Sequence, residues 1–276
     1  MGVVGRSIES VNKVFSDRRL IWKAGFLFGI NLILNLISFA VRASSSVVTF
    51  IPDSYGQGYK DFFSIFLSWI LPMLISFLTL PVWLYQKGYA YSISNNIRKG
   101  LDESVVPEHQ NIREKIKLGG VYLTIEYTLV MPFAIASLVP VIVFSVYPSI
   151  LDSLNISTSL IIVAATIFVA IAFAIIFLLI DSIVVPIMMY LYLKTGSLVQ
   201  AFSFKSFIKI LGSEWSAWIY MVILSITIAV ITMVVRVVLC FLSVAAGPFI
   251  QTISYLITSA VLGGIYYNID ARYRKK

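Results

Sequence analysis

The stretch LIIVAATIFVAIAFAIIFLLI, residues 160–180, contains one polar side chain, Thr166, and no glycine, proline or charge. A helix of this length reaches about 30 Å, which is the thickness of the hydrocarbon core of a bilayer. The apolar pattern resumes after Asp181 and Ser182 and runs from Ile183 to Leu193, with Pro186 inside it. The stretch therefore predicts a membrane-spanning helix that is interrupted by one carboxylate.

The composition of the whole chain agrees with this local prediction. Of the 276 residues, 59% are hydrophobic and 12% are charged, whereas about a quarter of the residues of an ordinary soluble domain are charged. We therefore expect an all-α polytopic integral membrane protein in which residues 1–276 form a single membrane domain. Six apolar segments are long enough to span: approximately 24–41, 62–85, 118–147, 160–192, 219–242 and 250–267.

Two amphipathic segments, residues 1–22 and Ser197–Leu211, precede the first and fifth expected spans and predict helices on the membrane surface. The apolar face of the first is expected to hold Ile8, Val11, Val14 and Phe15, which follow helical spacing. Gly212 is expected to end the second. A cleavable signal peptide is the rival interpretation of the N-terminus, but the long polar lead and the 18-residue apolar run favour a retained span.

The largest polar segment is Lys87–Lys117, which mixes both signs of charge and has few aromatic residues. This pattern predicts a solvated loop or a short surface helix and argues against a nucleic-acid site. Near the other end of the chain, Gly247 and Pro248 predict a turn between the fifth and sixth spans.

The basic residues lie almost wholly in alternate loops. The two termini, Lys87–Lys117 and Lys194–Glu214 together hold 18 of the 21 lysines and arginines, and the opposite loops hold only Arg42 and Lys60. The positive-inside rule then places both termini in the cytoplasm. Topology and attraction to anionic lipid headgroups explain the net charge of +8, so no nucleic-acid partner is needed.

Three ionisable residues fall within the expected spans, and each needs a partner, a water cavity, neutralisation or an interfacial position. They form the candidate intramembrane polar site: Glu126, Asp181 and Arg236. Counted from the cytoplasmic ends of their spans, Glu126 lies about 12 Å and Asp181 about 16 Å deep, whereas Arg236 lies about 27 Å deep. The favoured interpretation of Asp181 is an interfacial structural residue. Buried ion pairing or helix packing, and a proton or ligand site, are the alternatives.

Residues for the commonest catalytic and metal chemistry are scarce. Cys240 is the only cysteine and His109 the only histidine, so a metal site or a histidine relay would need carboxylates alone. No nucleotide-binding, zinc-protease or nucleophile-elbow motif occurs. We therefore expect no catalytic residues, no metal and no cofactor, and a protein that is not an enzyme.

A weak internal repeat is visible when the basic leads are aligned. Lys23-Ala-Gly25, Lys117-Leu-Gly119 and Lys209-Ile-Leu-Gly212 each open a pair of expected spans, at intervals of 94 and 93 residues. One interpretation is that the domain is built from three repeated units, each a basic amphipathic segment followed by a pair of spans. Chance is the other, because lysine and glycine are common at membrane interfaces.

The stretch from Pro186 through Tyr190 and Gly196-Ser197-Leu198 to Ala201-Phe202-Ser203-Phe204 resembles the prokaryotic membrane family catalogued as domain of unknown function 4013. Phe15-Ser16-Asp17 with Trp22 and Gly25, and Lys87-Gly88-Tyr89 with Pro107, fit the same family. The usual tryptophan soon after that proline is absent, since His109 follows Glu108. The resemblance implies a multi-pass membrane protein of bacteria or archaea and brings no activity or catalytic residues.

The sequence favours a non-enzymatic membrane protein that organises lipid or a membrane complex. A transporter or permease that uses Glu126 and Asp181 is the alternative. The expected partners are the lipid bilayer and either another membrane protein or further copies of this chain.

Overall fold

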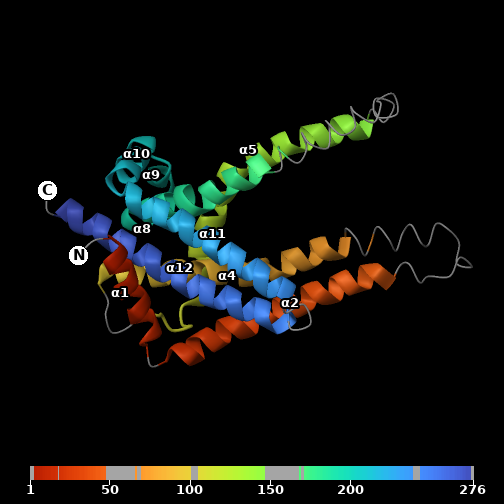
Figure 1. The fold of residues 1–276 in the computed structure, drawn as a ribbon, viewed down its shortest axis with the longest axis horizontal. Coiled ribbons are helices and arrows are strands. Elements are labelled where there is room, and N and C mark those ends of the chain that lie inside the picture. Colours follow the sequence, from red (N-terminus) through yellow and green to blue (C-terminus); the bar gives the residue numbers. More distant parts are fainter. Residues whose placement is uncertain are drawn as a thin grey trace, which may run out of the picture. The chain divides into compact units, whose positions relative to one another are not determined.

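The computed structural model describes residues 3–17, 19–47, 66, 70–100, 105–146, 168, 171–238 and 243–274. All regular structure within these ranges is helical, which confirms the all-α prediction (Figure 1). The first part of the apolar stretch 160–180 lies almost wholly outside them, and the rest is helical from residue 171 onward. The chain divides into two compact units: Met1–Gly120 with Ile226–Lys276, and Val121–Ser225.

The first unit is assembled on α12 (Ser243–Arg274). Three helices pack against it: α1 (Val3–Phe15), α2 (Leu20–Val47) and α4 (Leu71–Lys99). In the apolar window of α12, 56% of the residues are buried, against 17% in that of α2. This difference identifies α12 as the central helix of the unit. Its buried apolar residues are Leu256, Ala260, Val261, Leu262, Ile265, Tyr266 and Ile269.

Two adjacent glycines on α12 let two helices come close. A Cβ built on Gly263 would lie 2.6 Å from the Cβ of Ile97 on α4. A Cβ built on Gly264 would lie 2.9 Å from Ser10 Oγ and 3.1 Å from the backbone Cα of Ser7, both on α1. These distances are shorter than carbon–carbon and carbon–oxygen van der Waals contact, so both crossings depend on the absence of a side chain.

The face of α1 that packs on α12 is made of small side chains. Ser7, Ser10 and Val14 are at most 2% exposed, whereas Ile8 is 53% and Phe15 45% exposed. A close crossing on a glycine selects small side chains, and the two serines are smaller than isoleucine or phenylalanine. The contact of Ile8 and Phe15 with a membrane surface stays a prediction.

Polar side chains join α2, α4 and α12 inside the first unit. Asn31 Nδ2 donates to Thr252 Oγ1 at 3.0 Å, and Gln86 Nε2 donates to Asn31 Oδ1 at 2.8 Å. Thr252 Oγ1 in turn donates to the Pro248 carbonyl at 2.9 Å. Asn31, Gln86 and Thr252 are 1–3% exposed. Hydrogen bonds of this kind contribute about 1 kcal/mol each between membrane helices, and they also fix the register of the three helices.

A second close crossing joins α4 to the start of α5 (Ile112–Val146). A Cβ on Gly88 would overlap the backbone carbonyl of Lys115, and a Cβ on Gly119 would overlap the backbone of Leu84. Both obstacles are backbone, so no side-chain rotation can relieve them. Gly25 and Gly212, which align with Gly119 in the predicted repeat, have no atom within 4 Å of a built Cβ. The three glycines therefore do not play equivalent roles.

The second unit contains the rest of α5, a helix from residue 171 that includes the π-helical turn η4 (Ile180–Val184), and α8 (Val185–Thr195). In η4 the Val185 N–H donates to the Ile180 carbonyl. Pro186 lacks an N–H and would press on the carbonyl four residues earlier, and a wider turn relieves that clash. The carboxylate Asp181 thus lies in a turn whose geometry is set by the nearby proline.

The predicted helix Ser197–Leu211 is two helices, α9 (Leu198–Ala201) and α10 (Phe204–Ser213), both packed on α8. Each begins after a serine, Ser197 or Ser203, whose side chain accepts a backbone N–H from the first turn. Gly212 lies inside α10 and does not end it. The second serine cap explains the break that helical periodicity alone did not reveal. The next helix, α11 (Trp215–Val238), begins in the second unit and ends in the first.

Four helices in the described part of the chain are long and apolar enough to cross a membrane: Leu20–Ile37, Ile171–Thr195, Trp215–Val235 and Ala246–Arg274. The expected second span, 62–85, lies partly outside that part, and the third, 118–147, lies within α5 except for its last residue.

Two predicted boundaries were wrong. Helix α4 continues through the first 13 residues of the expected loop and ends at Gly100, whose φ of 73° suits a glycine C-cap. It continues because Gln86, Gly88 and Tyr89 are buried there. Gly247 and Pro248 lie inside α12, near its start. Proline has no backbone N–H, and at this position the hydrogen bond that it cannot make would have been to a carbonyl in the first turn of the helix.

The crossing of α4 and α5 predicts that glycine-to-alanine substitutions change the free energy of unfolding in opposite directions at crowded and at open positions. Gly88→Ala or Gly119→Ala should lower the free energy of unfolding by about 3 kcal/mol or more, because the new methyl group meets backbone. Gly25→Ala, in open surroundings on α2, should raise it by about 0.5–1 kcal/mol through the lower entropy of the unfolded chain. Thermal or denaturant unfolding in detergent measures both. Equal effects at Gly88 and Gly25 would contradict the close crossing.

Candidate functional site

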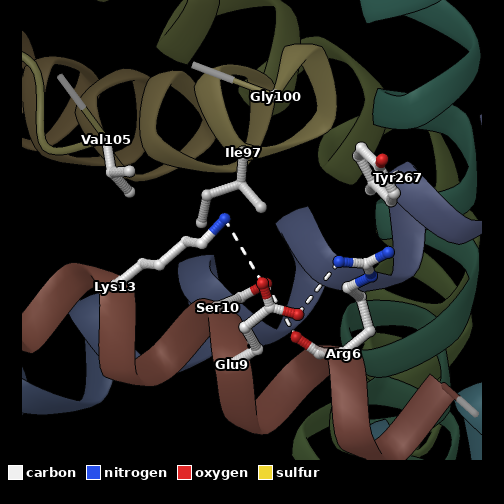
Figure 2. Close-up of a pocket in the computed structure, with 8 residues that line it drawn as sticks. All are labelled: Arg6, Glu9, Ser10, Lys13, Ile97, Gly100, Val105 and Tyr267. Atoms are coloured by element: carbon white, nitrogen blue, oxygen red, sulfur yellow. Dashed lines mark hydrogen bonds and ion pairs between the residues drawn. The ribbon is translucent and has the colours of Figure 1, made fainter. Parts of the chain in front are cut away.

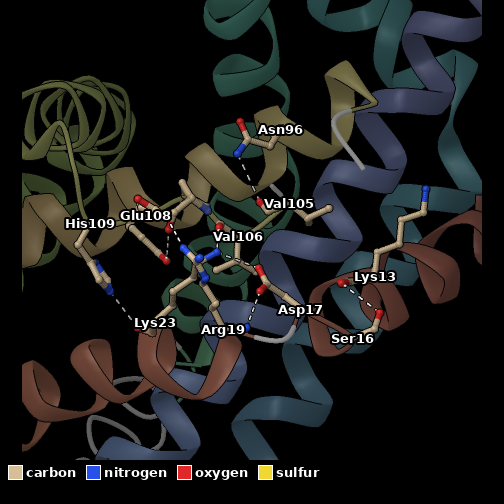
Figure 3. Close-up of polar contacts among 12 residues, drawn as sticks. Lys13, Ser16, Asp17, Arg19, Lys23, Asn96, Val105, Val106, Glu108 and His109 are labelled. Carbon is tan, nitrogen blue, oxygen red and sulfur yellow. Dashed lines mark hydrogen bonds and ion pairs between the residues drawn. The ribbon is translucent and has the colours of Figure 1, made fainter. Parts of the chain in front are cut away.

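The segment 105–111, between α4 and α5, is held against the first unit and carries the only histidine of the chain. Val105 is 4% and Val106 0% exposed. From α4, Tyr89 OH donates to the Pro107 carbonyl at 2.7 Å. Asn96 Nδ2, also on α4, donates to the Val105 carbonyl at 3.4 Å (Figure 3). Backbone carbonyls of the segment are thus satisfied by side chains of a neighbouring helix, as a buried loop requires.

Lys23 on α2 ties the same segment to the start of the chain. Its Nζ donates to the Val106 carbonyl at 2.5 Å and pairs with Asp17 Oδ2 at 2.9 Å. The side chains of Lys23 and Asp17 are 11% and 15% exposed. Asp17 also accepts the Arg19 backbone N–H at 2.8 Å, and the Arg19 guanidinium pairs with Glu108 at 2.9 Å. Removing either member of the Lys23–Asp17 pair would leave a nearly buried charge without its partner.

His109 lies among aromatic side chains of α2 and α4. Its ring stacks on Tyr89 with the centroids 5.1 Å apart and lies 4.2 Å from the centroid of Phe26. The Tyr85 hydroxyl and His109 Nδ1 are 2.5 Å apart, and His109 Nε2 is 3.1 Å from the Lys23 carbonyl. A carbonyl can only accept, so Nε2 carries the proton and Nδ1 accepts from Tyr85.

The surroundings of His109 favour its neutral form. Burial lowers the pKa of His109 below the ordinary value of 6.5. The hydrogen bond to the Lys23 backbone opposes this shift, and the cationic side chains of Lys115 and Lys23 add to it. Burial likewise lowers the pKa of Lys115, against the opposing charges of Glu114 and Glu108.

Lys115, near the start of α5, contacts the same group of residues. Its Nζ donates to the carbonyls of Glu108 and Gln110 and lies 5.4 Å from the ring centroid of Tyr89 and 6.0 Å from that of Tyr85. Cations at this distance from aromatic faces are stabilised by about 0.5–2 kcal/mol. We call the whole assembly, Asp17, Lys23, Tyr85, Tyr89, Val105–Gln110 and Lys115, the His109 cluster. Its polar groups are engaged with one another, so its evident chemistry is to hold the ends of four helices together.

The sequence analysis did not find the His109 cluster. Three of its members, Asp17, Tyr89 and Pro107, were noted as parts of the family resemblance but not as neighbours in space. The spacing of Tyr85 and Tyr89 was a further signal, because it puts two tyrosines on one face of a helix that was expected to end at the first of them.

Two of the predicted intramembrane residues, Glu126 and Asp181, lie in the second unit. Asp181 is exposed, and its Oδ1 accepts a hydrogen bond of 3.1 Å from Tyr122 OH on α5. Glu126 is half-buried and lies one helical turn beyond Tyr122. The hydroxyl of Ser182, next to Asp181, is buried and has no hydrogen-bond partner among the described residues. Tyr122 is therefore a site residue that sequence reasoning missed.

Two other residues singled out by the sequence cannot be placed in a site. Arg236 lies in α11, but its side chain is outside the described part of the structure, and Cys240 lies outside it altogether. Within the described ranges, no three histidine, cysteine, aspartate or glutamate side chains gather closely enough to hold a metal ion.

A family model described as "Protein of unknown function (DUF4013)" matches residues 71–241, more than half of the chain. The chain belongs to this family. The matched range of this DUF4013 protein includes Tyr89 and Pro107, which are joined by a hydrogen bond, and Gly88, which packs on the backbone of Lys115. It also includes the motif from Pro186 to Phe204. The N-terminal part of the resemblance, Phe15 to Gly25, lies outside the matched range. No match was found among curated proteins or among solved structures.

The environment of His109 predicts how stability changes with pH. Because the pKa of His109 is lower in the folded protein, the unfolded chain binds the extra proton first as the pH falls below 6.5. The stabilisation is complete above that value and is lost progressively below it. Thermal unfolding in detergent should show the melting temperature of the wild type falling more steeply from neutral to mildly acidic pH than that of His109→Gln.

The comparison isolates one group, because the variant has no histidine and keeps every carboxylate. Parallel pH profiles for the two proteins would mean that His109 is not held in its neutral form.

Proposed function

We propose that this DUF4013 protein is a non-enzymatic, multi-pass protein of the cytoplasmic membrane that organises lipid or a membrane complex. In this proposal the chain crosses the bilayer six times, with both termini in the cytoplasm. The support for the orientation is the confinement of 18 of the 21 lysines and arginines to alternate segments.

The observation that carries the proposal is the apolar stripe of α1. Val4, Ile8 and Phe15 fall on one helical face and are 45–53% exposed, while the small residues of another face pack on α12. Just beyond the helix, Ile21 and Trp22 are 82% and 84% exposed. One face of α1 thus packs on α12, a second face is apolar and exposed, and basic residues lie beside the apolar face. A helix of this kind is suited to lie at the level of the lipid headgroups.

The second unit carries a similar arrangement on α10. Phe204 is 76% and Ile208 48% exposed, and Lys205 and Lys209 alternate with them along the helix. These exposed apolar side chains support contact with acyl chains or with another membrane protein, including a further copy of this chain.

A transporter remains the second candidate, and one observation favours it. Asp181 lies in a π-helical turn, a feature frequent at functional sites. Beside it is the buried hydroxyl of Ser182, which has no hydrogen-bond partner in the described part of the chain. In this alternative Glu126 and Asp181 share a proton and release it on binding a substrate.

Lipid selectivity in reconstituted vesicles tests the proposal. In phosphatidylcholine vesicles with a minority of phosphatidylglycerol, spin-labelled phosphatidylglycerol should be immobilised by the protein in preference to spin-labelled phosphatidylcholine. Basic interfacial segments attract anionic headgroups by about 1 kcal/mol for each lysine or arginine near the surface. Asp181→Asn should leave that preference unchanged.

The opposite pattern would favour the transporter. It consists of no preference between the two lipids, together with a protonated-carboxyl infrared band that changes between mildly acidic and neutral pH and disappears in Asp181→Asn.

A further inference from the structure

Titratable side chains of the first unit gather at several places between its helices. One group lines the cavity between α1, α4 and α12, where Figure 2 shows Glu9 paired with Arg6 and Lys13, all on α1. Another is the His109 cluster, whose hydrogen bonds join the segment 105–111 to α2, α4 and α5. Because these bonds cross between elements, a change of charge in the His109 cluster acts on how the elements are held together.

The two ring nitrogens of His109 have opposite roles. Nε2 donates to the Lys23 carbonyl on α2, and Nδ1 accepts from the Tyr85 hydroxyl on α4. A second proton on the ring goes to Nδ1, so it turns the acceptor of the Tyr85 hydroxyl into a donor. Tyr85 is only 5% exposed, so its hydroxyl would then need a new acceptor where there is little access to water.

The charged and titratable groups around His109 come from each element that packs against it. They are Lys23 from α2, Tyr85 and Tyr89 from α4, Lys115 and Glu114 from α5, Glu108 from its own segment, and Asp17 and Arg19 from the connection between α1 and α2. Asp17 is paired with Lys23, and Glu108 with Arg19, each at 2.9 Å. These two carboxylates could therefore balance an imidazolium only by weakening an existing ion pair.

A cation on His109 would add to positive charge that is already present. Burial and the cationic side chains of Lys115 and Lys23 lower the pKa of His109 below 6.5, against the opposing hydrogen bond to the Lys23 backbone. The Tyr89 ring, stacked on His109, could attract an imidazolium, but Lys115 Nζ already lies 5.4 Å from its centroid. The proton is therefore bound more tightly when the segment is detached than when it is in place.

We propose that residues 107–110 form a proton-operated latch, which protonation of His109 releases from α2 and α4 while the helices of the first unit stay packed. The release is local for two reasons. Val105 and Val106 are 4% and 0% exposed and keep the start of the segment in the core. Short segments between helices also open at a lower free energy than the helices that they join.

The latch goes beyond the proposed function and does not depend on it. Under the proposed topology the segment faces the cytoplasm, so the latch would respond to acidification of the cytoplasm. Its opening in detergent can be measured whichever way the protein is oriented in a membrane.

The opening should depend on pH within one window. Above pH 6.5, the ordinary pKa of histidine, His109 is neutral whether the latch is closed or open, so the opening equilibrium does not change with pH. Below that value the open form takes up the proton first, and the opening constant rises by up to about tenfold for each pH unit. The rise ends at the lower pKa of the closed form.

Continuous-wave electron paramagnetic resonance of a spin label on the latch measures the opening. The label is attached at Gln110→Cys, an exposed position, in the full-length protein with Cys240→Ser. A second labelled protein carries the label at Asn12→Cys, an exposed position on α1, and reports general unfolding. His109→Gln is the matched variant, because an amide can donate and accept as a neutral imidazole does but gains no proton.

We expect the label at position 110 to be immobilised at about pH 7.5 and to show a mobile component that grows several-fold by about pH 5 and reverses on neutralisation. In His109→Gln the spectra at the two pH values should coincide. Tyr85→Phe removes a hydrogen bond that only the closed form makes, so its mobile component should appear at a pH higher by up to about one unit. The label at position 12 should not change.

Three results would overturn the inference. A label at position 110 that stays immobile down to about pH 5 would mean that protonation of His109 opens nothing. A mobile component that grows equally in His109→Gln would assign the opening to other groups, such as the carboxylates of Asp17 and Glu108. A label at position 12 that is mobilised at the same pH would mean that the whole unit unfolds. None of these results affects the lipid preference that tests the proposed function.

Discussion

The approach of α1 and α4 to the Gly263–Gly264 pair of α12 is the constraint on which the first unit depends. With no side chain at either position, Ile97 of α4 and the serines of α1 reach distances at which a Cβ could not be tolerated. In a membrane, where lipid competes on equal terms with apolar side chains, helices associate through such close packing and through interhelical hydrogen bonds. The cavity lined by Arg6, Glu9 and Lys13 lies between the same three helices, so its shape follows from this approach.

Polar contacts on either side of the glycine pair fix the position of α12 along α4. Toward the start of α12, Thr252 is linked through Asn31 to Gln86, and Ser94 Oγ of α4 donates to the Ser259 carbonyl at 2.8 Å. Beyond the glycines, the Arg98 guanidinium pairs with Asp270 at 3.3 Å. A slip of one helix along the other would break all of these at once and leave buried polar groups without partners. The contacts therefore select one register of α12 along α4, independently of how much each contact contributes to the free energy of folding.

The sequence predicted the helical class, the apolar segments and the basic amphipathic character of α1, because each depends on composition and periodicity within one segment. It could not show which face of α1 is buried, since Ser7 and Ser10 become a packing surface only opposite Gly264. The extension of α4 past Tyr85 was missed for the same reason: Gln86, Gly88 and Tyr89 look like the start of a loop until their partners are known. His109 was noted as the single histidine and as a departure from the family pattern, and neither observation showed that it joins Tyr85 on α4 to the Lys23 backbone on α2.

The same limit applies to the candidate sites. Asp181 was recognised from its place in an apolar segment, but its hydrogen bond to Tyr122 depends on the pairing of two helices far apart in the sequence. The trio Arg6, Glu9 and Lys13 is visible as helical spacing, yet only Tyr267 and Ile97 from other helices turn it into a cavity.

The docking of α1 on α12 can be measured directly by the distance between spin labels at Asn12→Cys on α1 and Arg272→Cys on α12, both exposed positions, after Cys240→Ser removes the native thiol. Pulsed electron paramagnetic resonance of the protein in vesicles should give one narrow distance distribution. Gly264→Val, which places a branched side chain against Ser7 and Ser10, should broaden it and move it to longer distances. A distribution that is broad in the unsubstituted background, or that is unchanged by Gly264→Val, would contradict the docking of α1 on this glycine.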